Sequence, residues 1–92
     1  MIACHLRITG RVQNVFYRNW FVEQARALGL DGWVRNRADG SVEAVVRGSS
    51  EMIDAIVAKA REGSPASRVE HVHVSDAAPD EMPNGFAKRP TL

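Results

Sequence analysis

The stretch Gly10-Arg11-Val12-Gln13-Asn14-Val15-Phe16-Tyr17-Arg18 decides the fold of this 92-residue chain, because the hydrophobic period changes across it. Before it, apolar and polar residues alternate over residues 2–9, as they do in a half-buried strand. After it, four apolar residues recur at the spacing of a helix. They are Tyr17, Phe21, Ala25 and Leu28. The sequence therefore predicts a strand at 2–9, a loop, and a helix at 16–28.

Arg18 falls in the first turn of that helix, where a positive charge is unfavourable. A helix N-terminus carries partial positive charge and unpaired N–H groups, and the first acidic residue of this helix is Glu23. A bound anion, held by loop N–H groups and the guanidinium group, would make the arrangement favourable. The alternative is a solvated arginine on a short loop, and these residues alone leave both interpretations open.

The remaining sequence predicts a second helix and four further extended segments. The helix begins after Gly48-Ser49-Ser50 and ends at Gly63. Its apolar stripe consists of Ile53, Ile56, Val57 and Ala60. Asp39-Gly40 predicts a hairpin turn between two strands. The extended segments, the last of them a short strand or tail, are expected at 32–38, 41–47, 69–75 and 86–91, and surface loops at 63–67 and 77–85.

The order of these elements is β-α-β-β-α-β with a short C-terminal strand. Both helices can pack on one face of an antiparallel sheet and bury its apolar side chains. The sequence therefore predicts an α+β fold, a ferredoxin-like two-layer sandwich, as a single domain over residues 1–92.

Composition narrows the classes of protein. The net charge of +1 indicates neither a nucleic-acid nor a membrane partner, and no run approaches the roughly 20 apolar residues of a membrane span. The N-terminus lacks the pattern of a signal peptide, and Cys4, the single cysteine, lies on the apolar face of the first strand. We therefore expect a cytoplasmic protein with a buried, unreactive thiol.

Two motifs resemble the acylphosphatase family. The first is Gly10-x-Val-Gln-x-Val-x-x-Arg18, and the second is Gly32-Trp33-Val34-Arg35-Asn36 followed by Asp39-Gly40-Ser41-Val42-Glu43. The resemblance covers residues 5–91. It departs from the family's pattern at Asn14, where glycine is usual. Asparagine tolerates a left-handed backbone better than other non-glycine residues, so we expect the loop to keep its shape.

The resemblance implies the hydrolysis of acyl phosphates to a carboxylate and inorganic phosphate, without cofactor or metal. It implies that Arg18 and Asn36 are catalytic, with Arg18 gripping the phosphoryl oxygens and Asn36 orienting the attacking water. It also implies that loop residues bind the substrate. These residues are Gln13, Asn14, Val15, Phe16 and Tyr17. The expected partners are a small acyl phosphate and inorganic phosphate, and the expected state is a monomer.

The chemistry of the loop fits this substrate class. The stretch at 10–18 contains no Asp, Glu, Cys or His that could act as a nucleophile, general acid or metal ligand. The leaving group of an acyl phosphate is a carboxylate of pKa about 4, which departs without a general acid. Phosphoryl transfer to water then needs mainly positioning and charge stabilisation.

The three histidines form a competing hypothesis. In a ferredoxin-like sheet the fourth strand lies beside the first, so His5, His71 and His73 should share the open face, where metal sites can form. No acid or cysteine completes the set, and an open sheet face is where polar residues belong, so we expect no metal. Arg35 is expected to be a surface charge, and Trp33 is expected to pack rather than stack on substrate.

Two other function classes stay open. Ferredoxin-like sheets can bind RNA through exposed aromatic residues on the central strands. Here those strands offer no aromatic pair, and we expect no RNA binding. Their outward residues are His5, Arg7, Glu43 and Val45. A phosphate-loop domain could also be a regulatory piece of a larger assembly, but we expect a free-standing enzyme.

Overall fold

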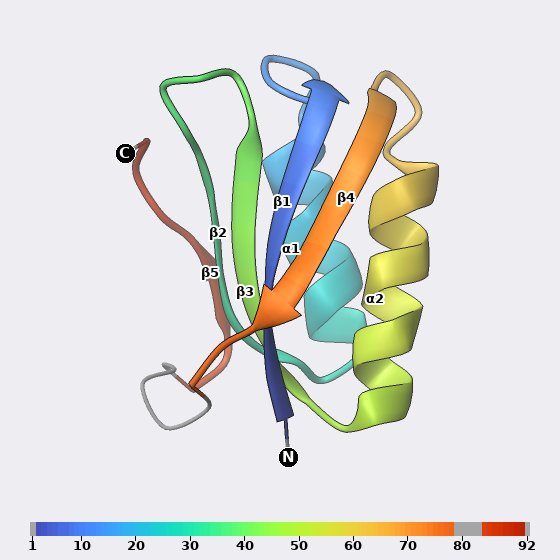
Figure 1. The fold of residues 1–92 in the computed structure, drawn as a ribbon, viewed down its shortest axis with the longest axis vertical. Helices are drawn as coiled ribbons and strands as arrows, with labels where there is room; N and C mark the ends of the chain where they lie inside the picture. The colour runs from blue at the N-terminus through green and yellow to red at the C-terminus, as the bar shows by residue number, and fades with distance from the viewer. Residues whose placement is uncertain (1, 79–83, 92) are drawn as a thin grey trace.

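The N-terminal alternating segment forms β1, Ile2–Arg11, the second strand in a five-stranded sheet of order β4-β1-β3-β2-β5 (Figure 1). In this computed structural model, which describes residues 2–78 and 84–91, both helices lie on one face of the sheet. The other elements are α1 (Tyr17–Ala27), β2 (Asp31–Asn36), β3 (Val42–Gly48), α2 (Ser50–Glu62), β4 (Arg68–Asp76) and β5 (Phe86–Lys88). The predicted two-layer sandwich and its element order are confirmed.

The prediction of an antiparallel sheet is correct for β1 to β4 and wrong for β5, which runs parallel to β2. Asp31 fixes where β5 begins, because its carboxylate accepts hydrogen bonds from the Gly85 N–H at 2.7 Å and from Arg47 at 2.6 Å. The chain therefore enters the sheet edge beside the start of β2 and continues in the same direction. The sheet is therefore mixed. A strand of three residues carries no sequence signal for its direction, so the sequence could not predict the parallel pairing.

The last strand is also shorter than predicted. It ends at Lys88, and the N–H of Arg89 makes a further bond to the Val34 carbonyl at 2.8 Å. Pro90 has no N–H with which to extend the ladder. The loop predicted at 77–85, with Pro79 and Pro83, lies partly outside the described residues.

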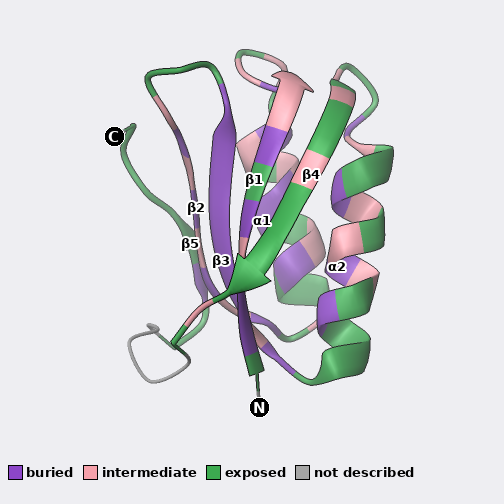
Figure 2. Cartoon of the chain, viewed as in Figure 1, coloured by how far each residue is buried: buried purple, intermediate pink, exposed green. Residues whose placement is uncertain are grey.

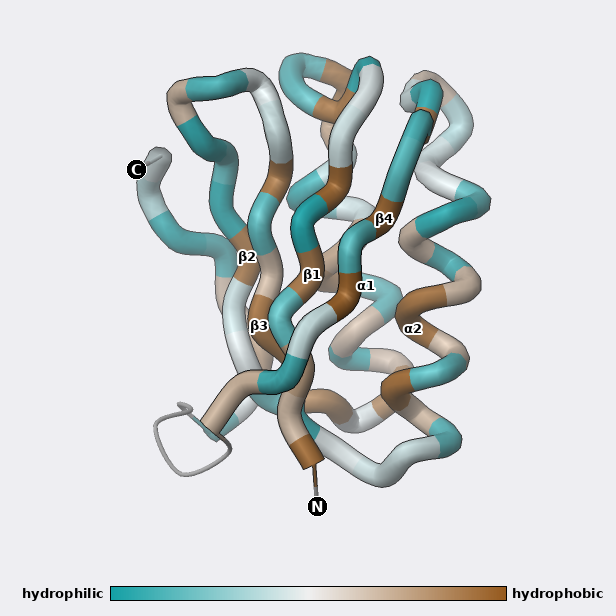
Figure 3. Tube along the Cα trace, viewed as in Figure 1, coloured by the Kyte–Doolittle hydropathy of each residue, from teal (hydrophilic) through white to brown (hydrophobic). Residues whose placement is uncertain are grey.

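The core lies between the sheet and the helices, and β3 is buried along almost its whole length, as Figure 2 shows. Figure 3 shows hydrophobic and hydrophilic residues alternating along β1 and β4, which is the pattern that sends apolar side chains to the helices. The largest fully buried side chains are Tyr17, Phe21, Leu6, Ile8, Ile56, Val12, Val34, Val42 and Val46. Cys4 is buried as predicted, and burial raises the pKa of its thiol. No helix in the described part of the chain is long and apolar enough to cross a membrane.

Glu43 organises the open face of the sheet. Its side chain is buried, and its carboxylate accepts hydrogen bonds from His5 at 2.6 Å, Arg35 at 2.7 Å and Arg37 at 3.1 Å. Burial alone would raise the pKa of Glu43, but the bonds from His5 and Arg35 and the charges of Arg35 and Arg37 lower it. The interpretation of Arg35 as a plain surface charge is therefore wrong.

The histidines do not gather as the metal hypothesis required. The rings of His71 and His73 lie 5.8 Å apart on β4, whereas His5 is hydrogen-bonded to Glu43. The sequence did not predict that an acidic residue would pair with one of the histidines. Within residues 2–78 and 84–91 no group of three or more His, Cys, Asp or Glu side chains could hold a metal ion. Trp33 is half-buried on the open face, with the guanidinium groups of Arg35 and Arg89 at 4.6 Å and 4.8 Å from its ring centre.

The lowered pKa of Glu43 predicts a loss of stability in acid. Because the folded-state pKa lies below the ordinary value of 4.5, ionised Glu43 stabilises the fold above that pH. This contribution is lost as the pH falls through the folded-state pKa. We expect the free energy of unfolding, measured with urea, to decrease as the pH falls below 4.5, and to do so less steeply in Glu43→Gln. Equal pH slopes for the two proteins would contradict this role of Glu43.

Candidate active site

The loop between β1 and α1 contains two residues in the left-handed region, Asn14 with φ 59° and Phe16 with φ 58°. The premise that Asn14 adopts positive φ is confirmed. Phe16 was not expected there, since a bulky aromatic residue is unfavourable in this region and nothing in the sequence announces it. Phe16 precedes α1, its carbonyl accepts a hydrogen bond from the Trp20 N–H at 3.1 Å, and the residue is 81% exposed.

Glycine is needed at the start of this loop. Gly10 has φ 119°, and a Cβ there would lie 2.2 Å from the carbonyl oxygen of Arg68 on β4. The register between β1 and β4 shifts between Thr9 and Gly10, so the irregularity turns the chain out of the sheet at this point. The strand can therefore continue to Arg11 while the loop bends toward α1.

Gln13 ties the loop to the turn between β2 and β3. Its side-chain amide donates to the carbonyl of Arg37 at 2.8 Å and to that of Ser41 at 2.9 Å. Asp39 closes the same turn, because it accepts bonds from the hydroxyl and the N–H of Ser41 at 2.6 and 3.0 Å, which lower its pKa to about 2. Since Arg37 directly follows Asn36, these bonds fix the end of β2 relative to the loop.

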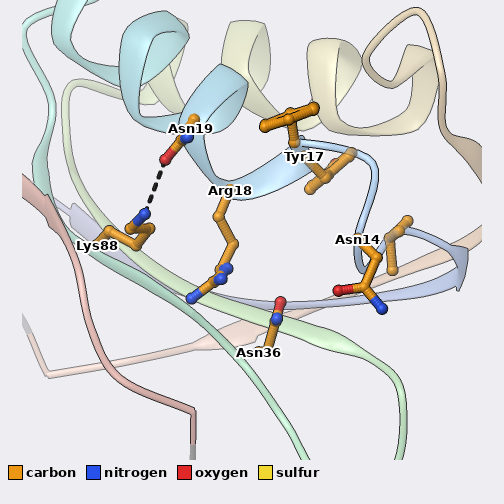
Figure 4. A pocket seen from close by; sticks show the side chains of 8 residues that line it. Asn14, Tyr17, Arg18, Asn19, Asn36 and Lys88 are labelled. Carbon is orange, nitrogen blue, oxygen red and sulfur yellow. Dashed lines mark hydrogen bonds between the residues drawn. The ribbon is translucent and has the colours of Figure 1, made fainter.

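A cavity of about 390 Å³ opens between the loop, α1, β2 and β5. Figure 4 shows Arg18 reaching down from α1 toward the amide of Asn36, with Asn14 to one side and Lys88 to the other. The lining residues are Val12, Asn14, Phe16, Tyr17, Arg18, Asn19, Asn36 and Lys88. The fold thus brings the two predicted catalytic residues to one site, although one comes from a helix and the other from a strand.

The helix end in this cavity is electropositive. The first turn of α1 has no acidic residue and no side-chain cap. In the part of the chain that the structure describes, the N–H groups of Tyr17, Arg18 and Asn19 find no acceptor, and the guanidinium group of Arg18 makes no hydrogen bond or ion pair. These donors converge where the helix dipole is positive, which is the arrangement that binds an anion.

Asn36 presents an unsatisfied acceptor to the same space. The residue is 8% exposed, and its Oδ1 has no hydrogen-bond partner among the described residues. Leaving a buried acceptor unpaired costs about 1–3 kcal/mol, so a donor such as a water O–H would stabilise it. The alternation of β2 explains its direction, because Gly32, Val34 and Asn36 all face the helices.

Tyr17 lines the cavity, and its hydroxyl group stabilises the packing of the two helices. The hydroxyl donates to the Ala60 carbonyl at 2.9 Å, which joins α1 to α2, and burial raises the pKa of this phenol. A phenol so placed is no proton donor for the cavity. Val15 packs partly buried against the core.

Of the residues predicted for the site, the cavity is lined by Asn14, Phe16, Tyr17, Arg18 and Asn36, and not by Gln13 or Val15. The sequence interpretation missed Asn19 and Lys88. Asn19 follows Arg18 in the first turn of α1, and its position next to the predicted catalytic arginine could have marked it as a site residue. Lys88 could not, because its approach depends on the parallel pairing of β5.

Known proteins resemble this chain over nearly its whole length. A family model described as acylphosphatase matches residues 4–88. An acylphosphatase of Rhizorhabdus wittichii is 52% identical over 91 residues, which cover 99% of this chain and 91% of the relative. One of Rhodospirillum rubrum is 47% identical, covering 95% and 94%.

Solved structures give the same result. The crystal structure of acylphosphatase from Bacillus subtilis superposes with a TM-score of 0.92 at 31% identity, covering 97% of this chain and 99% of that one. An acylphosphatase structure from Coxiella burnetii gives 0.90 at 32% identity, covering 96% and 92%. The coverage is close to complete on both sides in each case.

The left-handed conformation of Asn14 predicts which side chains the loop accepts. Asn14→Gly should keep the free energy of unfolding, because glycine adopts positive φ freely, whereas Asn14→Val should lose about 1–3 kcal/mol, because β-branched residues are strained there. Urea denaturation measures both. Glu70→Val is the control, since Glu70 is an exposed residue in the extended backbone of β4, outside the left-handed region. Equal stability of the glycine and valine variants would show that the loop relaxes without strain.

Proposed function

This chain belongs to the acylphosphatase family, and on that premise we propose that it hydrolyses acyl phosphates in the cavity between the loop, α1, β2 and β5. One observation carries the proposal. An arginine with no partner among the described residues faces a buried asparagine whose oxygen is unpaired, at a helix end with no acidic residue. The site thus lacks an anion and a hydrogen-bond donor, and the phosphoryl group and a water supply one each.

The phosphoryl group binds between Arg18 and the start of α1. The guanidinium fork donates two parallel hydrogen bonds to phosphoryl oxygens, and the free N–H groups of the first helical turn donate to the others. Asn14 and Phe16, held at positive φ, shape the loop so that its N–H groups turn toward the same space. Gln13 contributes by holding the loop in place rather than by contact with the substrate.

Asn36 places the attacking water. Its Oδ1 accepts a hydrogen bond from that water, which orients a lone pair of the water oxygen toward phosphorus. The P–O bond to the acyl oxygen breaks as the new P–O bond forms, and the carboxylate leaves without protonation because its pKa is low. The water's proton passes to a phosphoryl oxygen, giving inorganic phosphate.

This mechanism needs no metal ion. The described residues that line the cavity include no carboxylate, imidazole or thiol, which are the side chains that would hold one or act as a base. Charge stabilisation by Arg18 and the helix end takes the place that a metal has in other phosphoryl transfers. We propose accordingly that the enzyme needs no cofactor.

The setting that fits this activity is a monomer acting on free small molecules in the cytoplasm. The buried, unpaired Cys4 suits a reducing compartment. The cavity is of the size that holds small molecules and is formed by one chain.

Phosphate release from benzoyl phosphate tests the activity, and Arg18 is the first residue to change. Arg18→Ala should lose hydrolysis by at least about 10³-fold with little loss of stability, and Arg18→Lys should fail largely, because a point charge cannot replace the guanidinium fork. Arg61→Ala, on α2, is the matched control and should keep full activity. Activity of Arg18→Ala within about threefold of the unchanged protein would remove Arg18 from the mechanism.

Inorganic phosphate gives a second readout for the same residue. At a hundredfold excess over Kd it should stabilise the fold by about 2.7 kcal/mol, a melting-temperature rise of roughly 10–20 °C that saturates with concentration. The saturable part should vanish in Arg18→Ala. If it persisted there, the anion would bind elsewhere and the assignment of this cavity would be wrong.

Asn36 is tested by a separation of kcat from KM. Asn36→Ala should lower kcat by about 10²-fold or more and leave phosphate binding nearly intact, because the water loses its position while the anion site remains. A higher KM at constant kcat would make Asn36 a substrate-binding residue instead. EDTA should leave the activity unchanged, and a phosphate monoester such as 4-nitrophenyl phosphate should be a poor substrate.

A further inference from the structure

Lys88 brings a second cation to the cavity from the opposite end of the chain. The parallel pairing of β5 with β2 places Lys88 beside Val34, which lies two residues before Asn36 on the same face of β2. The ammonium group of Lys88 donates to Oδ1 of Asn19 at 3.0 Å, which holds it at the wall of the cavity (Figure 4). Its place there is therefore a product of the fold and not of either motif.

The ammonium group of Lys88 keeps capacity for a ligand. An ammonium group has three N–H donors, and Asn19 takes one of them. Among the described residues no carboxylate pairs with Lys88, whereas four of the arginines on or near the sheet do have acidic partners. The positive charge is thus directed at the cavity without being neutralised there.

The cavity is larger than a phosphoryl group requires. A water molecule occupies about 30 Å³ in the liquid, so a cavity of about 390 Å³ has the volume of roughly a dozen waters. A phosphoryl group and one attacking water fill a part of this space. The rest is available to the acyl group of the substrate.

Lys88 lies at the end of the cavity that is opposite to Asn14 and the loop. In Figure 4, Asn14 and Lys88 flank the pair formed by Arg18 and Asn36 from opposite sides. If the phosphoryl group sits against the loop, as proposed above, the acyl group extends away from Asn14 and toward Lys88. Phe16, an exposed apolar residue of the loop, also lines the cavity, and Arg18 and Lys88 are the two cations among its described lining residues.

We propose that Lys88 selects acyl phosphates whose acyl group carries a second anionic group, a carboxylate or a phosphate. This inference rests on the proposed function, since it concerns the leaving half of the same substrate. Lys88 donates hydrogen bonds to the second anionic group while Arg18 holds the phosphoryl group. Asn19 is the positioning residue that keeps the ammonium group at the cavity wall.

The test compares substrates that differ only in that second charge. The ratio of kcat/KM for 3- or 4-carboxybenzoyl phosphate to kcat/KM for benzoyl phosphate reports the selectivity. We expect a preference of roughly fivefold for one carboxylated isomer, the upper value for an exposed ion pair, and a decrease of this preference with added salt. The rigid ring prevents the carboxylate from attacking the anhydride itself.

Variants of Lys88 decide what causes the preference. Lys88→Met keeps the stem and should bring the ratio to about 1, Lys88→Glu should bring it below 1, and Lys88→Arg should restore a preference. Lys59→Met, on α2 and outside this cavity, is the matched control and should keep the ratio of the unchanged protein. Melting temperatures show whether each variant is folded.

Two outcomes would overturn the inference. One is a ratio of 1 or less in the unchanged protein for both isomers. The other is an equal loss on benzoyl and carboxybenzoyl phosphates in Lys88→Met, which would assign Lys88 to the phosphoryl group. Failure of the proposed function itself looks different, because the unchanged protein would then hydrolyse none of these substrates.

Discussion

The two hydrogen bonds of the Gln13 side chain are the interaction on which the site depends. They join the loop to the carbonyls of Arg37 and Ser41, which lie 24 and 28 residues further along the chain. Each such bond contributes about 1 kcal/mol, which is small beside the burial of the core. Their importance is geometric, because the loop between β1 and α1 and the end of β2 are otherwise connected through the whole α1 and the sheet. With the bonds in place, Arg18 and Asn36 face one cavity before any substrate arrives.

The two faces of the sheet divide the work. The helix-facing side carries the apolar core and, at the end of β2, the polar Asn36. The open side carries the charges, and Glu43 collects His5, Arg35 and Arg37 around one buried carboxylate. Arg35 and Arg37 precede and follow Asn36, so this network restrains the backbone on both sides of the residue that we propose orients the water. The open face thus helps to set the geometry of the cavity although its charged side chains do not line it.

Sequence patterns predicted those parts of the structure that depend on interactions within one segment of the chain. Alternation in residues 2–9, the Asp39-Gly40 turn and the tolerance of Asn14 for positive φ each have a local cause, and each is confirmed. The direction of β5, the left-handed Phe16 and the place of Lys88 depend instead on contacts between distant segments. No periodicity within a single segment could reveal them. The resemblance to a family singled out Arg18 and Asn36 as site residues, whereas the structure alone shows that they face each other across one cavity.

The outer edge of β4 has a consequence for the behaviour of the chain at high concentration. β4 is nine residues long and pairs on one side only, so the described structure leaves a row of its N–H and C=O groups open to water. Such an edge is a template for pairing with another molecule. Its exposed residues include Arg68, Glu70, His71, His73 and Asp76. A second copy that paired along this edge would have to displace the water that hydrates these charged and imidazole side chains, so their polarity disfavours association through β4.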